Sequence, residues 1–492
     1  MEGSCPAPYA KLSPGLNRIP GNLRSIHLMG ICGTGMASLA GILKEKGYEV
    51  KGSDQNVYPP MSDFLRKLGI PIREGYAPRN LHPRPDLVIV GNVITRLNPE
   101  ALELARLGIP YLSFPQALKI FAIEEKRPIV VCGTHGKTTT SSMIAWLLER
   151  SGMDPGFMIG GIPLNFSTGF KLGKGPYFVV EGDEYDTAFF DKGPKFLHYA
   201  PWASVLTSIE FDHADIYRDL EHVLESFRKL IRILPSSGVI VANGDDPLVR
   251  AEVEKAPCRV ITYGFGSDVD WRAVDVEVRE NGTRFRILMD GDEYLRIKTP
   301  VYGDHNIHNL LSTVALSAFL GEAPAVTAEA ALSFLGVKRR QEIRGEKGGV
   351  LVLDDFAHHP TAVRETLRAV REKYRGRRIV AVFEPRSNSS RRRVFQARYA
   401  ESFNAADRVL IPEPPMMEKV PLQERFSSKK LVADLLQRGV QATYHPDTES
   451  LLRALLGGIK RGDVVLVMSN GSFDNLIDRL LKRMDNFPVP QR

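Results

Sequence analysis

Cysteine is scarce in this chain of 492 residues, which contains only Cys5, Cys32, Cys132 and Cys258. The four are scattered, with no CxxC pair and without the ligand spacing of a structural zinc or iron–sulfur site, which excludes a site of that kind. So few cysteines also exclude a disulfide scaffold. We therefore expect reduced thiols and a cytoplasmic protein.

Long apolar runs and a strong excess of one charge are also missing. No apolar stretch approaches the ~18 residues of a membrane span, and the start, MEGSCPAPYAKLSPG, lacks the pattern of a signal peptide. Lys+Arg 65 against Asp+Glu 58 gives a net charge of +7, which suits phosphates but is too diffuse to predict nucleic-acid binding. We expect neither a membrane nor a nucleic-acid partner.

The chain is long enough for roughly three domains of about 150 residues. Short continuous apolar runs alternate with helix-patterned stretches, which is typical of parallel sheets covered on both faces. After an arm over residues 1–22, expected to be flexible, three such α/β units cover 23–122, 123–335 and 336–492. Within the second unit, residues 269–298 alternate instead and contain Asn-Gly and Asp-Gly turns, which predicts antiparallel hairpins.

The sharpest motif is VVCGTHGKTTT at residues 130–140, between a predicted strand and a predicted helix. Backbone N–H groups and the positive end of the helix dipole form an anion cradle there, Lys137 can reach the β- and γ-phosphates, and a Thr hydroxyl can bind Mg²⁺. The usual GxxxxGK[ST] spacing would place a glycine at Val131, so this loop is a shorter variant. The predicted phosphate-binding residues are Gly133, Thr134, Gly136, Lys137, Thr138 and Thr139.

A second glycine loop follows the first predicted strand and contains Gly30, Gly33 and Gly35. Its spacing is GxxGxG, whereas the dinucleotide fingerprint is GxGxxG, and Asp54 is only loosely placed for a ribose. The loop is compatible with a nicotinamide cofactor, with a nucleotide-linked diphosphate, or with a structural turn alone.

Acidic side chains recur at later strand ends, in VVEGDEYD (residues 179–186) and SIEFDHADIY (residues 208–217). Ligands gather where parallel strands end, and Mg²⁺ prefers carboxylates, so we expect these segments beside the phosphate loop. The segment YGDHNIHN (302–309) offers Asn306 and Asn309 to a purine edge or only caps a helix, and RRQEIRG (339–345) offers positive charge to a polyphosphate. In DDFAHHP (354–360) the adjacent His358 and His359 should point to opposite faces of a strand and not share an ion.

In order along the chain, GICGTGM, GTHGKTTT, EGDEYD, EFDHAD, GDHNIHN, RRQEIRG and DDFAHHPT resemble the Mur ligase family, the ATP-dependent amide-bond formers of peptidoglycan synthesis. The resemblance covers nearly the whole chain after about residue 23. It implies a Rossmann-like N-terminal domain for a UDP sugar, a central P-loop ATPase domain, and a Rossmann-like C-terminal domain that closes over ATP and brings the amine.

The resemblance also implies roles for individual residues. Gly30, Gly33, Gly35 and Asp54 would bind the UDP sugar, whereas Asn306, Asn309, Arg340 and Asp355 would join the phosphate loop in binding ATP. Thr138, Glu181 and His213 would hold Mg²⁺, and Lys137, His213 and Arg340 would be catalytic. Arg386, Ser387, Asn388 and His358 would face the peptide. One departure is Ser208, where family members commonly have Asn.

Within the family, the stretches VYPPMSDFL, GNVITRLNPE, PGFMIGGIPLNF, EPRSN and MSNGSF favour a narrower assignment. They resemble the members that join UDP-N-acetylmuramate to the tripeptide L-alanyl-γ-D-glutamyl-meso-diaminopimelate, recovered from old cell wall, through an acyl phosphate. The alternative is UDP-N-acetylmuramate:L-alanine ligase, which typically reads QPHRY where this chain reads EPRSN. Alternatives of another class are an NAD-dependent dehydrogenase and a P-loop nucleotide switch, and the oligomeric state is open.

Overall fold

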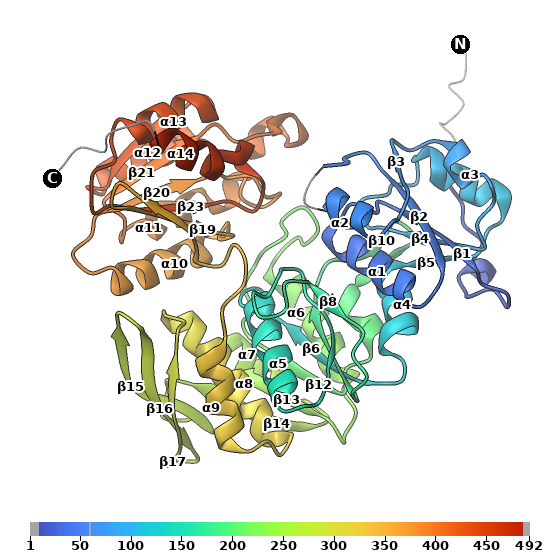
Figure 1. The fold of residues 1–492 in the computed structure, drawn as a ribbon, viewed down its shortest axis with the longest axis horizontal. Coiled ribbons are helices and arrows are strands. Elements are labelled where there is room, and N and C mark those ends of the chain that lie inside the picture. Colours follow the sequence, from blue (N-terminus) through green and yellow to red (C-terminus); the bar gives the residue numbers. More distant parts are fainter. Residues whose placement is uncertain (1–8, 59–60, 486–492) are drawn as a thin grey trace.

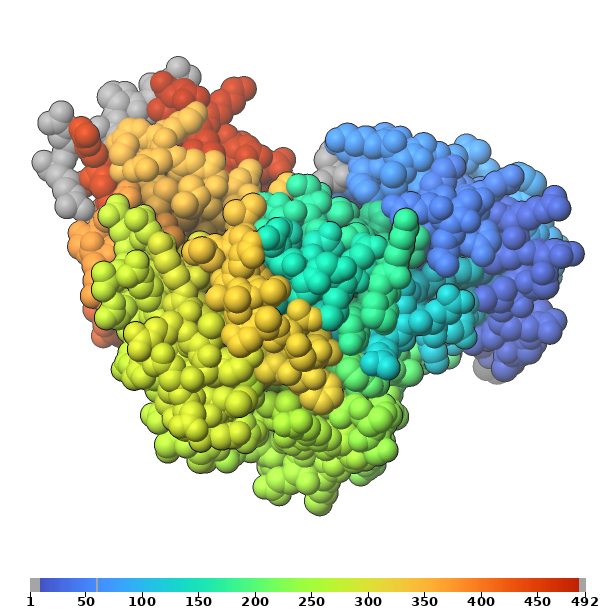
Figure 2. Space-filling model, turned by 60° about the horizontal axis from the view of Figure 1, so that its bottom comes forward, coloured from blue at the N-terminus to red at the C-terminus, as the bar shows by residue number. Residues whose placement is uncertain are grey.

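The computed structural model describes residues 9–58 and 61–485, which form three domains in sequence order (Figure 1). In that view the N-terminal domain lies at the right, the C-terminal domain at the upper left, and the central domain below and between them. Figure 2 shows the N-terminal and C-terminal domains apart from each other on either side of the central one. The predicted α/β class with parallel sheets is confirmed.

The N-terminal domain is a parallel sheet in the order β3-β2-β1-β4-β5. Its elements are β1 (Ser25–Met29), α1 (Thr34–Glu45), β2 (Glu49–Asp54), α2 (Met61–Lys67), β3 (Ile72–Glu74), β4 (Leu87–Val90), α3 (Pro99–Leu107), β5 (Tyr111–Ser113) and α4 (Phe114–Leu118). The strand order reverses beside β1, which is where open α/β sheets bind ligands. Residues 9–22 of the predicted arm pack on this domain, where Asn17 exchanges side-chain hydrogen bonds with Gln116.

The central domain is built on one sheet in the order β17-β16-β15-β14-β13-β12-β6-β9-β7-β8. Its strands are β6 (Arg127–Cys132), β7 (Gly156–Met158), β8 (Phe170–Lys171), β9 (Tyr177–Gly182), β12 (Ala203–Leu206), β13 (Val239–Asn243), β14 (Arg259–Gly264), β15 (Trp271–Arg279), β16 (Gly282–Met289) and β17 (Asp292–Thr299). Its helices are α5 (Lys137–Arg150), α6 (Leu220–Arg232), α7 (Pro247–Val253), α8 (Asp304–Phe319) and α9 (Pro324–Ser333), and β10 (Asp186–Ala188) pairs with β11 (Asp191–Pro194).

The central sheet has a parallel half and an antiparallel half, and the hydrophobic pattern of the sequence differs between them. The strands β6, β12 and β13 pair in parallel and bury almost every side chain, as their continuous apolar runs predict. The strands β15, β16 and β17 form the predicted antiparallel meander, and Asp290 and Gly291 between the last two both have positive φ, as a type I′ turn requires.

The C-terminal domain is a six-stranded sheet in the order β18-β19-β23-β20-β21-β22, parallel except for β18. Its elements are β18 (Glu342–Lys347), β19 (Val350–Asp355), α10 (Pro360–Lys373), β20 (Ile379–Phe383), α11 (Gln396–Ser402), β21 (Arg408–Pro412), α12 (Ser428–Gln437), β22 (Gln441–His445), α13 (Thr448–Leu456), β23 (Val464–Met468) and α14 (Leu476–Met484). No helix in the described part of the chain has the length and apolar character needed to cross a membrane.

The C-terminal domain contacts the central domain through the segment that follows β12. Ser389 Oγ donates to Asp212 Oδ1 at 2.6 Å, Asn388 Nδ2 donates to Asp215 Oδ2 at 2.7 Å, and Arg398 Nη2 donates to Glu210 Oε2 at 2.8 Å. The predicted closing domain is therefore seated against the strand ends of the central domain.

Candidate active site

A cavity of about 1490 Å³ lies where the three domains meet. It is lined by Gly33 and Gly35 from the first domain, by the phosphate loop and the acidic strand ends from the second, and by Arg386 and its neighbours from the third. All the predicted site residues line this cavity except Gly30, Asp54 and Gly133. Chain segments hundreds of residues apart thus converge on a single space that can hold more than one substrate.

Two glycines give the phosphate loop its shape. Gly133 and Gly136 have φ of +123° and +81°. A Cβ on Gly133 would lie 2.3 Å from Thr207 Oγ1, and one on Gly136 would lie 2.5 Å from Asn309 Oδ1. The loop is also fixed by Ser208, whose carbonyl accepts from the Thr134 N–H at 2.9 Å and whose hydroxyl accepts from the His135 N–H at 3.0 Å. The short side chain at 208 therefore supports the loop's backbone.

We expect Gly133→Ala to destabilise the fold. The added methyl group would meet Thr207 and the backbone of Ser208 while the residue is held at positive φ, a combination that costs at least about 1 to 3 kcal/mol. Urea denaturation should show a lower midpoint for this variant. The matched control is Gly21→Ala, because a Cβ at Gly21 would meet no atom within 4 Å. Equal midpoints for both variants would contradict the prediction.

Lys137 is the first residue of α5 and points back across the loop. Its Nζ donates to Gly133 O at 2.7 Å and to Glu184 Oε2 at 3.1 Å. Burial alone would lower the pKa of Lys137. The charges of Glu184 and Asp183 outweigh this effect and raise the pKa above its usual value, so the ammonium group stays protonated. The lysine is thus held charged beside the free N–H groups of a helix N-terminus, where an anion binds well.

The same acidic residue, Glu184, also orients His213. His213 Nε2 lies 3.4 Å from Glu184 Oε1. Burial would lower the pKa of His213, yet its hydrogen bond to Glu184 raises that pKa to about 8. Glu184 therefore bridges two predicted catalytic side chains, a role that sequence reasoning did not assign, although the motif EGDEYD marked the residue as acidic and close to the phosphate loop.

The predicted metal residues Thr138 and Glu181 are in contact. Thr138 Oγ1 donates to Glu181 Oε2 at 3.2 Å, while Glu181 Oε1 accepts from the Gly160 N–H at 2.7 Å. Burial and the negative charge of the neighbouring Asp183 raise the pKa of the Glu181 carboxyl, although the charges of Lys137 and Arg340 act in the opposite direction. A hydroxyl beside a carboxylate is an oxygen donor set that suits Mg²⁺.

Arg340 crosses from the third domain to this pair. Its Nη2 donates to Thr138 Oγ1 at 3.2 Å, and its guanidinium carbon lies 4.5 Å from the centre of the Phe356 ring. Burial lowers the pKa of Arg340, while the nearby carboxylates of Asp355 and Glu181 oppose that effect. A charged side chain from the third domain therefore reaches Thr138, beside the other predicted phosphate-binding residues.

A histidine cluster links the phosphate loop to the third domain. One ligand atom each of His135, Glu210 and His359 lie within 4.8 Å of one another. Glu210 Oε2 already accepts from Thr361 Oγ1 at 2.9 Å and from Arg398, and His359 follows β19 as the cap of α10. Because the carboxylate is paired with an arginine, the cluster serves as a polar bridge between the domains. His358 and His359 lie in the loop after the strand, where the first lines the cavity and the second faces His135.

On the predicted adenine side, Asn306 and Asn309 lie in the first turns of α8. Asn306 Nδ2 donates to Tyr302 O at 3.0 Å and to Gln341 Oε1 at 3.3 Å, and Asn309 Nδ2 lies 3.4 Å from Asn306 Oδ1. Asp355 accepts from the backbone N–H of Gln341 at 2.8 Å and of Ala357 at 2.7 Å. These residues form a connected polar wall that joins the two domains.

The predicted UDP-sugar residues divide into two groups. Gly33 caps α1 and lines the cavity together with Gly35, which packs against Phe114. Asp54 accepts from the Cys32 N–H at 2.9 Å and from the Asn56 N–H at 2.9 Å, so both of its oxygens fix backbone beneath the loop. Gly30 has φ +83° and lies outside the cavity lining, as Asp54 does.

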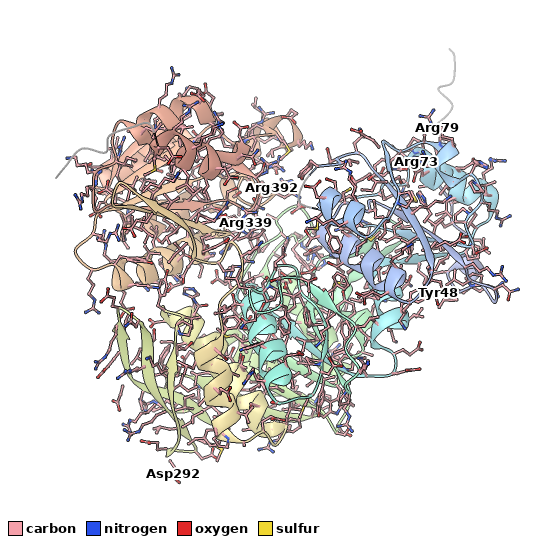
Figure 3. All side chains as sticks on the ribbon, in the orientation of Figure 1. Tyr48, Arg73, Arg79, Asp292, Arg339 and Arg392 are labelled. Atoms are coloured by element: carbon pink, nitrogen blue, oxygen red, sulfur yellow. The ribbon has the colours of Figure 1, made fainter. Side chains whose placement is uncertain are left out.

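The segment EPRSN lies at the end of β20 and meets the acidic loop of the central domain. Asn388 and Ser389 contact Asp215 and Asp212, and Arg391 Nη2 donates to Asn388 Oδ1 at 2.6 Å. Arg386, Ser387 and Asn388 line the cavity. Figure 3 places the nearby Arg339 and Arg392 on the side of the C-terminal domain that faces the centre of the molecule.

Known proteins share this arrangement. Residues 25–126 match the Mur ligase family catalytic domain, 131–317 the Mur ligase middle domain, and 339–471 the Mur ligase glutamate ligase domain. The UDP-N-acetylmuramate–L-alanyl-γ-D-glutamyl-meso-2,6-diaminoheptandioate ligase of Escherichia coli (strain K12) is 42% identical over 458 residues, covering 93% of this chain and 97% of that protein. A UDP-N-acetylmuramate–L-alanine ligase of Desulforamulus reducens is 34% identical, covering 95% of this chain and 99% of its own length.

Among solved structures, the crystal structure of a murein peptide ligase from Psychrobacter arcticus aligns with a TM-score of 0.73 and 33% identity. The alignment covers 94% of this chain and 99% of that one. These matches confirm the resemblance inferred from the motifs, and they extend over the three domains that build the cavity.

Proposed function

Because the chain belongs to the Mur ligase family, whose members are ATP-dependent ligases, we propose that it joins UDP-N-acetylmuramate to L-alanyl-γ-D-glutamyl-meso-diaminopimelate. The products are the UDP-linked muramoyl tripeptide, ADP and phosphate. Family membership gives no support to a nicotinamide-dependent dehydrogenase or a nucleotide switch.

In this proposal ATP binds between the second and third domains. Lys137 and the N-terminus of α5 receive the phosphates, Asn306 and Asn309 face the adenine, and Asp355 and Arg340 approach from the closing domain. Support comes from the way these groups line one cavity and from the contact of Arg340 with Thr138. Gly33 and Gly35 on the opposite side of the cavity bring the UDP sugar toward the same space.

Mg²⁺ would be held by Thr138, Glu181 and His213, and when bound it would neutralise charge on the transferring phosphoryl group. The adjacent hydroxyl and carboxylate of Thr138 and Glu181 suit this ion. His213 is paired with Glu184, which raises its pKa to about 8, and an imidazole must be neutral to bind a metal.

The reaction proceeds in two displacements. The muramoyl carboxylate attacks the γ-phosphorus, the bond to the bridging oxygen breaks, and ADP leaves, which gives an acyl phosphate. The peptide amine then attacks the carbonyl carbon, loses a proton and expels phosphate. Lys137, Arg340 and the helix N-terminus offset the charge of two approaching anions, which is a task of positioning and electrostatics. No protein nucleophile takes part.

The choice of the amine substrate rests on the EPRSN segment, residues 384–388, which follows β20 in the third domain. Arg386, Ser387 and Asn388 line the cavity, and the hydrogen bonds of Asn388 and Ser389 to Asp215 and Asp212 support a position of this segment close to His213. Ser387 and Asn388 are smaller than the side chains in QPHRY, which leaves room for a longer acceptor, and Arg386 can receive a peptide carboxylate.

A phosphate-release assay with UDP-N-acetylmuramate and ATP tests this choice when L-alanine and the tripeptide are offered separately. We expect kcat/KM for the tripeptide to be at least roughly tenfold higher, because binding of its distant charged groups orients the amine. The control omits UDP-N-acetylmuramate, and phosphate release should then fall to background. A preference for L-alanine would assign the chain to the alanine-adding members of the family.

A further inference from the structure

Beside Arg386, the cavity wall contains an asparagine whose side-chain oxygen is buried and unpaired in the part of the chain that the structure describes. Asn470 follows β23 and lines the cavity, yet its buried Oδ1 has no hydrogen-bond partner among the described residues. An amide oxygen shielded from solvent and left unpaired costs free energy, so such a group in a binding cavity indicates a donor supplied by a ligand.

The backbone around Asn470 is fixed from both sides. Arg339 Nη2 donates to Ser469 O at 2.6 Å and to Gly471 O at 2.7 Å, and the Gly471 N–H donates to Ser469 Oγ at 2.9 Å. Ser469 Oγ in turn donates to Glu384 Oε2 at 2.5 Å. These contacts fix the backbone on both sides of Asn470, so its side chain starts from a rigid segment of the cavity wall.

Arg386 lies directly against this segment. A Cβ built on Gly471 would fall 2.2 Å from Arg386 Cδ and 2.3 Å from its Nε, so only glycine lets the arginine lie there. Glu384 Oε1 stands 3.5 Å from Arg386 Nη1, which leaves most of the guanidinium donors for another acceptor. An arginine and an unpaired amide oxygen therefore adjoin each other on one wall of the cavity.

A carboxylate and an ammonium group on the same carbon atom are the chemical complement of this pair. We propose that Arg386 and Asn470 form the subsite for the distal zwitterion of the diaminopimelyl residue, with Arg386 receiving its carboxylate and Asn470 Oδ1 its ammonium group. This assignment rests on the proposed function, because it places the far end of the tripeptide whose near end carries the reacting amine.

Two analogue peptides test the two contacts separately. The tripeptide with L-lysine in place of diaminopimelate lacks the distal carboxylate, and the tripeptide with 2-aminopimelate lacks the distal ammonium group. We expect the wild-type enzyme to use each analogue with kcat/KM reduced roughly ten- to a hundredfold, as for the loss of a hydrogen bond to a charged group.

The variants should then divide. Asn470→Ala should use the diaminopimelyl and 2-aminopimelyl peptides equally while it still discriminates against the lysyl peptide. Arg386→Ala should use the diaminopimelyl and lysyl peptides equally while it still discriminates against the 2-aminopimelyl peptide. Gly471→Ala should behave in the same way, because its methyl group displaces the arginine without removing it. Asn470→Asp keeps the acceptor oxygen and should retain the preference for the ammonium group. The matched control is Asn404→Ala, on an exposed residue outside the cavity, which should behave as wild type.

The outcomes separate the two proposals. Failure of the wild-type enzyme to ligate the tripeptide would overturn the proposed function, whereas tripeptide ligation with unchanged analogue ratios in Asn470→Ala would overturn only this subsite. Equal thermal melting temperatures for variants and wild type, together with an unchanged KM for ATP, identify a change in peptide recognition and not a loss of fold.

Discussion

Lys137→Ala is expected to reduce ligation by on the order of 10³-fold or more with the fold intact. The side chain is held by Gly133 O and Glu184, and its charge is preserved in a buried setting. Removal of a desolvated cation from a phosphate clamp removes stabilisation that water cannot replace. The measurement is phosphate release with both acceptors present, together with circular dichroism to check the fold.

The matched control is Lys229→Ala, because Lys229 is an exposed lysine on α6 outside the cavity. It should retain wild-type turnover. A second comparison is Glu184→Gln, which keeps the size of the residue and removes the charge that pairs with both Lys137 and His213. We expect an intermediate loss there. Near-normal turnover in Lys137→Ala would remove the phosphate loop from the mechanism.

The phosphate loop and the parallel strands around it were predictable because their causes are local. A buried strand, a Gly-rich turn and a helix follow one another within about twenty residues around Lys137, and this order brings backbone N–H groups together at a helix N-terminus, where anions bind. The buried runs of β6, β12 and β13 likewise determine a parallel sheet covered on both sides. Short strands such as β3 and β7, three residues each, have too few side chains to show a pattern.

The pairings across domains were not predictable, because no local pattern records them. Glu184 was recognised as acidic, but its bridge between Lys137 and His213 depends on how the loops after β9 and β12 meet. The contact of His135 with Glu210, and the Asn470 Oδ1 left without a partner among the described residues, likewise arise only from tertiary structure. Asp54, which the family resemblance assigned to the UDP sugar, accepts from the backbone N–H of Cys32 in the glycine loop and from that of Asn56.

The role of Arg340 depends both on a local sequence motif and on a contact between domains. The charge of the motif RRQEIRG predicted a role near the phosphates, and only the family resemblance singled out Arg340 from Arg339. In the structure they diverge: Arg339 holds the segment of Ser469 and Gly471, whereas Arg340 points to Thr138. Its guanidinium lies over the Phe356 ring, which fixes the plane of the fork while leaving donors free. The arginine that completes the site thus depends on the third domain being seated on the second.

We therefore expect Arg340→Ala to lower kcat by on the order of 10²-fold or more while ATP still binds, as for the removal of one preorganised donor from a developing negative charge. Arg340→Lys should recover little of the lost kcat, because an ammonium group lacks the planar pair of donors that a guanidinium group offers. The control is Arg368→Ala, on an arginine whose side chain is 65% exposed. Single-turnover phosphate release separates chemistry from binding. If Arg340→Ala instead raised only the KM for ATP, the arginine would act in nucleotide binding and not in phosphoryl transfer.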